Sequence, residues 1–289
     1  MNEIDFQTRE AIEKRTRMAL KDAGITDPPS NADYLLESLS LYREYYNLED
    51  PGLLRRVAHT LHVGSRRIIK IAKKIDLRAL LLQREAQILI DFSLHDRKKT
   101  WACFHEITHK ILPWHRYFYI GDTAQTLDPF YRERLDLEAN YGASDLIFCG
   151  ESFTKMALDT TPCLDSVDLL RKKFRTSYTA TTRRYVEHSH ELPMALLISI
   201  PNWHDVSDGM EERCRYFTKS KQFKKKFSHI SEEVVLSEID SNTTKRRGGI
   251  VGVYEMILPD DNNVLHEFLA ESFYNQYDII SLIVYRNKV

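Results

Sequence analysis

The sequence predicts an α+β fold in three parts: a mostly helical region with a small sheet (1–155), a helix pair (156–190) and a smaller α/β domain (191–289). Two short apolar runs precede a helical segment that contains His-Glu-Ile-Thr-His, as expected for a small sheet followed by a helix. Several apolar runs bounded by proline or glycine lie beyond residue 191, as expected for strands. An apolar fraction of 43%, with 11% aromatic residues, is sufficient for buried cores.

The region before the motif is expected to be mostly helical. Pro28 and Pro29 break the chain after a first helix, and Asn31 or Asp33 is placed to cap a second one. Two apolar runs on either side of a polar turn at 83–85 predict a pair of strands. The expected elements are helices at 4–23 and 34–42, two helices within 53–74, and strands at 79–82 and 86–92.

The segment His105-Glu106-Ile107-Thr108-His109 places two histidines four residues apart. On a helix these side chains lie on one face, so both imidazoles can bind one zinc ion. The glutamate between them is then placed to move the proton of a water molecule at the metal. The alternative is a partly exposed helix with two ordinary histidines. Pro113 is expected to end the helix, and His115 beyond it is expected at the surface, with a position lining the cleft as the alternative.

A catalytic zinc site usually has a third protein ligand and leaves one position open. Asp136 and Glu138 are the candidates, in a segment whose small residues Ala139, Gly142 and Ala143 allow close packing against another helix. At about 100° per residue, the two carboxylates point about 200° apart on a helix. The residues alone leave both candidates open.

These segments resemble the ImmA/IrrE family of zinc metallopeptidases. The resemblance rests on the two-histidine motif with Trp101 before it, and on the Ala139-Asn140 pair in the later segment. The third ligand of the family is a glutamate three residues before the Ala-Asn pair. That position is Asp136 here, so the resemblance favours Asp136 over Glu138. It covers roughly residues 22–188, and the order of a strand pair followed by the metal helix is common in zincin folds.

The resemblance implies a zinc-dependent endopeptidase with one Zn²⁺ per chain, or Mn²⁺ in its place. The implied ligands are His105, His109 and Asp136, with Glu138 as the alternative to Asp136. Glu106 would take the proton from water and deliver it to the leaving amine. The implied substrate is a protein, typically a helix-turn-helix transcriptional repressor cleaved in a stress or mobile-element response. Two alternatives are a non-catalytic regulator that binds a repressor or DNA, and a zinc hydrolase with a small substrate.

Residues 169–185 resemble the helix-turn-helix that follows the peptidase core in this family, where it is usually structural. Direct nucleic-acid binding by this element is therefore an alternative that is not favoured. Some family members then carry a GAF-like sensor domain, and a plain interaction domain is an equal alternative. The basic clusters at 219–227 and 245–247 are expected in solvated loops, with a nucleic-acid or acidic-partner contact as the alternative. The expected elements are strands at 194–200, 234–239, 249–258 and 279–285 and a helix at 263–276.

Charge and cysteine usage complete the prediction. A net charge of −1 provides no general attraction to nucleic acid or to a membrane. No stretch approaches the ~20 apolar residues of a membrane span, and the N-terminal residues contain no apolar signal region. The four cysteines show no C-x-x-C spacing, as expected for the reduced thiols of a cytoplasmic protein.

Overall fold

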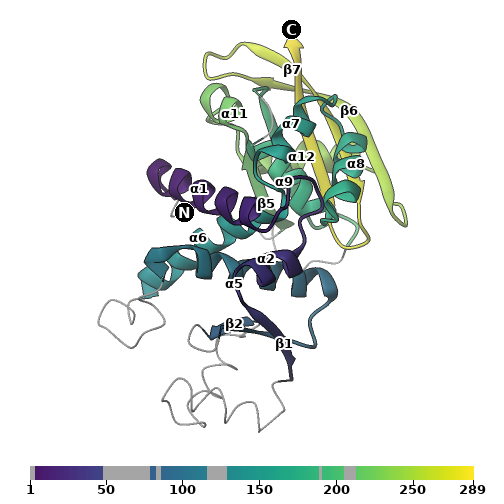
Figure 1. Cartoon of the computed structure of the whole chain (residues 1–289). Helices are drawn as coiled ribbons and strands as arrows, with labels where there is room; N and C mark the ends of the chain where they lie inside the picture. The colour runs from purple at the N-terminus through teal and green to yellow at the C-terminus, as the bar shows by residue number, and fades with distance from the viewer. Residues whose placement is uncertain (1–3, 48–78, 83–85, 116–128, 189–190, 205–212) are drawn as a thin grey trace. The chain divides into compact units, whose positions relative to one another are not determined.

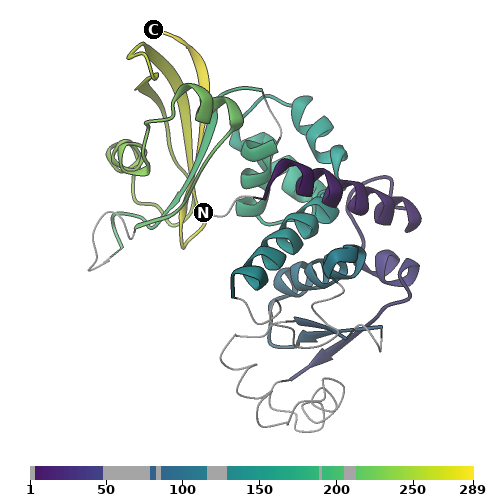
Figure 2. The same cartoon turned by 90° about the vertical axis from the view of Figure 1, so that its left-hand side faces the viewer.

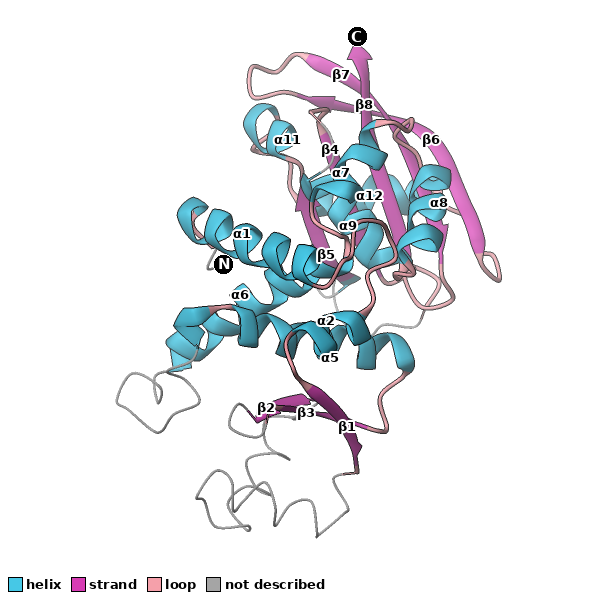
Figure 3. Ribbon diagram, in the orientation of Figure 1, coloured by secondary structure: helices cyan, strands magenta, loops and turns pink. Residues whose placement is uncertain are grey.

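The computed structural model describes residues 4–47, 79–82, 86–115, 129–188, 191–204 and 213–289. The chain divides into two compact units, Met1–Ser152 and Phe153–Val289, and each contains its own sheet, drawn in magenta in Figure 3. The combination of helices with a mixed three-stranded sheet and an antiparallel five-stranded sheet confirms the α+β class. The helices expected within 53–74 and the turn expected at 83–85 lie outside the described residues.

In the first unit, helix α5 (Asp96–Ile111) packs on a three-stranded sheet, and α6 (Pro129–Ile147) packs on α5 (Figure 1). The strand order is β1-β3-β2, with β1 parallel and β2 antiparallel to β3. The strand pair and the first helix are confirmed, whereas the helix expected over 34–42 ends early because Ser40 adopts a left-handed φ of 52° and a strand follows. The elements are α1 (Phe6–Asp22), α2 (Ala32–Ser38), β1 (Tyr42–Tyr46), β2 (Ala79–Leu82), β3 (Gln87–Asp91), α5 (Asp96–Ile111) and α6 (Pro129–Ile147).

Helix α5, which carries the two-histidine motif, has defined ends. His95 precedes its first turn, and its Nδ1 accepts a hydrogen bond from the backbone N–H of Arg97 at 3.3 Å. The helix ends at Ile111, two residues before Pro113, as predicted. A single 3₁₀ turn at 113–115 then reverses the chain, with the His115 N–H donating to the Leu112 carbonyl at 3.1 Å. This turn brings His115 back towards the histidines of the helix.

Helices α5 and α6 approach closely because α6 has a glycine at the contact. A Cβ atom on Gly142 would lie 2.5 Å from Cγ2 of Thr108 and 3.1 Å from Cγ2 of Ile12. Thr108 is fully buried, and its hydroxyl donates to the Phe104 carbonyl at 2.8 Å, which holds its methyl group against α6. The expected close packing of the small-residue segment is therefore present at this position.

Gly142→Ala is expected to destabilise the protein by about 1–3 kcal/mol, because the added methyl group overpacks a core contact that Thr108 cannot relieve without breaking its hydrogen bond. The free energy of unfolding from denaturant titration measures this loss. The double variant Thr108→Ser/Gly142→Ala removes the opposing methyl group and should recover most of the stability. A Gly142→Ala protein as stable as the parent would contradict this account of the contact.

The second unit is built on a five-stranded antiparallel sheet in the order β5-β4-β8-β7-β6. Helices α11 and α12 cover one face and α8 and α9 the other, as Figure 2 shows. The strands expected at 194–200, 249–258 and 279–285 are confirmed. The remaining elements are α7 (Glu151–Leu158), α8 (Leu164–Phe174), α9 (Tyr178–His188), β4 (Met194–Ser199), β5 (Cys214–Lys219), α11 (Lys221–Lys226), α12 (Glu232–Asn242), β6 (Gly249–Pro259), β7 (Leu265–Tyr274) and β8 (Ile279–Lys288).

Two elements of this unit differ from the prediction. The segment expected as a strand at 234–239 is part of helix α12, because Val235, Leu236 and Ile239 are buried at helical spacing and two glutamates occupy the first turn. The segment expected as a helix at 263–276 is strand β7, because every second residue from 266 to 274 is buried. Several of these inward residues are polar or small, which hides the period of two in the sequence.

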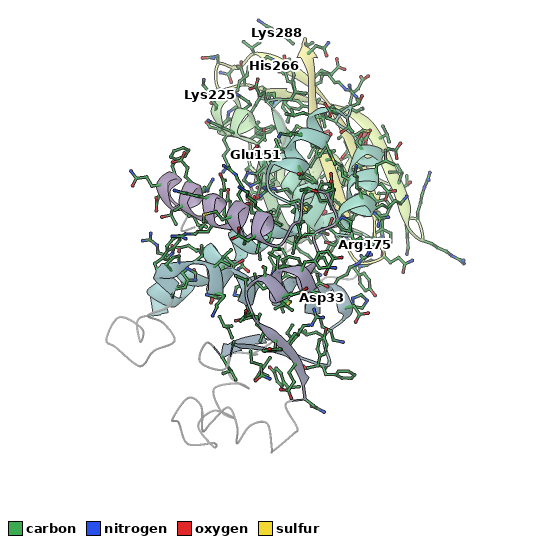
Figure 4. The ribbon with its side chains drawn as sticks, viewed as in Figure 1. Asp33, Glu151, Arg175, Lys225, His266 and Lys288 are labelled. Atoms are coloured by element: carbon green, nitrogen blue, oxygen red, sulfur yellow. The ribbon has the colours of Figure 1, made fainter. Side chains whose placement is uncertain are left out.

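The basic segment at 219–227 is also different from the expected loop. Residues 221–226 form the short helix α11, and Phe223 and Phe227 are completely buried in the core of the second unit. The lysines lie on the outside of this turn, and Lys225 is labelled in Figure 4. The aromatic residues interleaved with the lysines therefore anchor the helix to the sheet.

The helix pair α8 and α9 contains the two helices expected within 169–185. Arg175, labelled in Figure 4, ends α8 in a left-handed conformation with φ of 55°. Helix α9 packs on β4 and β5, and Arg183 on it pairs with Glu187 at 3.0 Å and lies over the ring of Tyr216. One face of the second helix therefore packs on the sheet of its own unit.

Candidate metal centre

The two histidines of the motif point towards one another from successive turns of α5. Their Nε2 atoms are 3.1 Å apart. In a tetrahedral site with zinc–nitrogen distances of ~2.0–2.1 Å, two imidazole nitrogens are separated by roughly 3.3 Å. His109 is almost completely buried, and the side chain of His105 is 19% exposed. The pair therefore presents two nitrogen atoms at metal-ligand spacing, at the edge of the core.

Asp136 on α6 supplies the third group of this cluster. Its Oδ1 atom is 3.9 Å from Nε2 of His105 and 3.9 Å from Nε2 of His109. One potential ligand atom from each of these residues lies within 4.8 Å of the others, so the triad could hold a metal ion. The side chain of Asp136 is 65% exposed, which places the third side of the cluster towards solvent.

The other ring nitrogen of each histidine has a hydrogen-bond partner. Nδ1 of His105 is 3.0 Å from Oδ1 of Asn140, which lies one helical turn after Asp136. Because an amide oxygen only accepts, this contact places the His105 proton on Nδ1 and leaves the Nε2 lone pair for a metal. Asn140 belongs to the Ala-Asn pair of the sequence pattern, but the sequence did not show that it contacts His105.

Burial keeps both imidazoles neutral, which is the form that binds metals. It lowers the pKa of His105 from its usual range, although Asp136 and Asn140 act in the opposite direction. It lowers the pKa of His109 well below that range, and the neighbouring rings of His105 and His115 add to the effect. The neutral rings meet the requirement for metal binding near neutral pH.

Glu106 lies beside the cluster in an apolar environment. Burial raises its pKa to about 8, against a hydrogen bond from the backbone N–H of Leu81 in β2. Within the described residues, its Oε2 atom is buried without a hydrogen-bond partner. A buried carboxylate oxygen without a partner is costly, and a water molecule or a reacting group at the cluster would satisfy it.

Glu138, the alternative third ligand, lies in a different network. Its Oε2 accepts from Nε1 of Trp114 at 2.6 Å and is 3.1 Å from Nε2 of His115, while its Oε1 accepts from Nε of Arg134 at 3.0 Å. Burial opposes its ionisation, but these three hydrogen bonds lower its pKa overall. Glu138 is therefore an ionised, buried acceptor that is paired away from Nε2 of the two motif histidines.

His115 is not the surface residue that the sequence suggested. It is completely buried, because the 3₁₀ turn after Pro113 folds it against α5 and α6. Its Nδ1 is 2.8 Å from Nδ1 of His109. The only signal for this buried position in the sequence was a polar residue shortly after the proline that ends the helix.

The fold and the cluster together define an α+β protein with a His-His-Asp site able to hold a metal ion. Among the helices that the structure describes, none combines the length and apolar character needed to cross a membrane. No protein-family model matches the chain, and no curated protein matches it. Among solved structures, the chain is similar to a Mycobacterium tuberculosis transcriptional regulator, with a TM-score of 0.53 and 8% identity over 96% of this chain and 88% of the other. At that identity the similarity is one of fold alone.

Proposed function

We propose that the protein is a metal-dependent endopeptidase that uses zinc, or manganese in its place. The observation that carries this proposal is the convergence of His105, His109 and Asp136, with the unpaired Oε2 of Glu106 beside them. Two neutral imidazoles and a carboxylate are a ligand set that zinc accepts at a catalytic site. A zincin-like fold for the first unit is part of the same proposal.

A divalent ion held by the triad would polarise a substrate carbonyl and lower the pKa of water. The residues of the chain then have separate tasks. Glu106 accepts a proton from the attacking water and donates it to the leaving amine, in a buried position that excludes competing solvent. Asp136 leaves the exposed side of the cluster accessible to an incoming peptide.

The sequence pattern supports a protein substrate, and we infer a helix-turn-helix transcriptional repressor cleaved in a stress or mobile-element response. In this proposal the second unit acts as a GAF-like sensor or as an interaction domain that controls or recruits the peptidase. One face of helix α9 packs on β4 and β5, which supports a structural role for the helix pair rather than DNA reading.

The metal content of the purified protein tests the proposed site. The parent, loaded with zinc and then dialysed, is expected to retain about one ion per chain, and His109→Ala and Asp136→Ala are expected to retain far less, because each removes a ligand. Glu133→Ala, an exposed carboxylate one turn earlier on α6, is the matched control and should bind like the parent. Elemental analysis reports the stoichiometry. A parent that takes up neither zinc nor manganese would overturn the proposal.

The second candidate is a non-catalytic regulator of the same fold. The similar solved structure is named a transcriptional regulator, and this observation favours a regulatory role for the fold. The two candidates differ in the fate of a bound repressor. Cleavage by the zinc-loaded protein supports the peptidase, whereas a stable complex with an intact repressor supports the regulator.

A further inference from the structure

Beyond the triad, a chain of buried hydrogen bonds leads from the proposed metal site into the protein. It runs from Nδ1 of His109 to Nδ1 of His115 at 2.8 Å, and from Nε2 of His115 to Oε2 of Glu138 at 3.1 Å. His115 is completely buried, and Glu138 is 2% exposed. Buried polar groups of this kind are retained where each has a partner, and here each group is paired with the next.

The acceptor at the end of the chain determines where the protons lie. Both carboxylate oxygens of Glu138 accept from groups that can only donate, Nε1 of Trp114 and Nε of Arg134, so Nε2 of His115 is the donor to Oε2 and carries a proton. When Nε2 of His109 binds the metal, the remaining proton of its neutral ring is on Nδ1, so Nδ1 of His115, 2.8 Å away, is the acceptor in this contact. These contacts direct Nε2 of His109 towards His105 and Asp136, where the metal would be held.

We infer that His115 and Glu138 are positioning residues, which hold His109 in the tautomer and orientation that bind the metal. The inference rests on the proposed metal site and adds two residues to it that touch neither the ion nor the substrate. It also gives Glu138 a role that excludes it as third ligand. Carboxylate–histidine pairs behind a metal-binding imidazole fix the ring and raise its basicity.

The surroundings keep this pair in place. Trp114, from the same 3₁₀ turn as His115, donates to the carboxylate oxygen that His115 contacts, which fixes the rotamer of Glu138. Arg134, one turn earlier on α6, binds the other oxygen and also lies 3.5 Å from Oδ2 of Asp5 at the start of α1. Segments from three parts of the first unit thus meet behind His109.

The test compares two substitutions of His115, one that offers an acceptor to His109 and one that does not. In His115→Phe the ring volume is kept but the acceptor is lost, and the affinity for Zn²⁺ is expected to fall about 10- to 100-fold, as when other outer partners of a metal ligand are removed. In His115→Asn the amide oxygen lies close to the position of Nδ1 and can accept from His109. This variant should bind Zn²⁺ within a few-fold of the parent.

A second pair of variants, at position 138, tests the inference independently of any folding defect caused by substitutions at position 115. Glu138→Leu is expected to weaken Zn²⁺ binding like His115→Phe, whereas Glu138→Gln keeps an oxygen that accepts from Trp114 and His115 and should bind nearly as tightly as the parent. Competition with a chromogenic chelator measures the dissociation constants, and circular dichroism checks each fold. In the zinc-loaded parent, ¹⁵N shifts of the His115 ring should show its proton on Nε2, with Nδ1 as the acceptor.

The outcomes separate this inference from the proposed function. If the parent binds one zinc ion but folded His115→Phe and Glu138→Leu bind it equally well, the positioning role is wrong and the metal site stands. A proton on Nδ1 of His115 in the zinc-loaded parent would also overturn the positioning role. If the parent binds no metal, both proposals are wrong.

Discussion

Replacing Glu106 by glutamine is expected to reduce peptide-bond cleavage by about 10²- to 10⁴-fold while leaving metal binding intact. Glutamine has nearly the same size and can still accept the backbone hydrogen bond from Leu81, so the helix and its histidines should keep their positions. What is lost is the group that can take up and release a proton beside the cluster. The assay incubates the zinc-loaded protein with purified helix-turn-helix repressors of the source organism and follows their intact masses.

The matched control for this experiment is Glu133→Gln, an exposed glutamate on α6 that lies outside the cluster. It should cleave at the parental rate. Cleavage by Glu106→Gln at the parental rate would show that another group handles the proton. If the zinc-loaded parent leaves every repressor intact and forms stable complexes with them, the non-catalytic regulator becomes the better description.

Phe227→Ala is expected to lower the free energy of unfolding of the second unit by about 3–5 kcal/mol. Phe227 is completely buried, with its ring 5.0 Å from that of Phe268 and 5.1 Å from that of Phe223, and it also packs edge-on against His266. Truncation leaves a cavity between α11 and the sheet that these large rings cannot fill by small movements. The other residues of α11 then lose the side chain that holds this helix against the sheet.

Chemical denaturation, with hydrogen exchange of the sheet amides as a local readout, measures this change. Tyr277→Ala serves as the control, because that side chain is 74% exposed and its removal should change stability by less than about 0.5 kcal/mol. A loss below about 1 kcal/mol in Phe227→Ala would mean that α11 contributes little to the core of the unit.

The local features of the candidate site can be predicted from the sequence, because they depend on helix geometry alone. Histidines four residues apart on a helix must share a face, and a proline must end the helix. The helix α5 and the spacing of its two histidines can therefore be predicted without a structure. The choice between Asp136 and Glu138 needs the register of α6 against α5. The structure places Asp136 beside the histidines and directs Glu138 to Trp114 and Arg134.

Features that depend on contacts between different elements could not be predicted from the sequence. His115 follows the helix-ending proline, where a polar residue is usually exposed, and only the turn at 113–115 reveals its burial. In the second unit, continuous apolar runs predict β6 and β8 correctly. The inward face of β7 includes the polar residues His266 and Ser272 among apolar ones. The alternation of buried and exposed residues is therefore not visible as an alternation of apolar and polar residues in the sequence.

The position of β8 within its sheet affects how damage to the chain would spread. This strand pairs with β4 on one side and β7 on the other, so it joins two halves that otherwise share no strand pairing. A chain cut between β7 and β8 would keep one β4–β5 hairpin and one β6–β7 hairpin, each with a newly exposed strand edge. Unpaired apolar edges are templates for intermolecular pairing, so such a fragment would aggregate rather than persist as a smaller folded unit. Loss of β8 by proteolysis at that turn, or by a premature stop codon there, is therefore expected to remove the protein from solution.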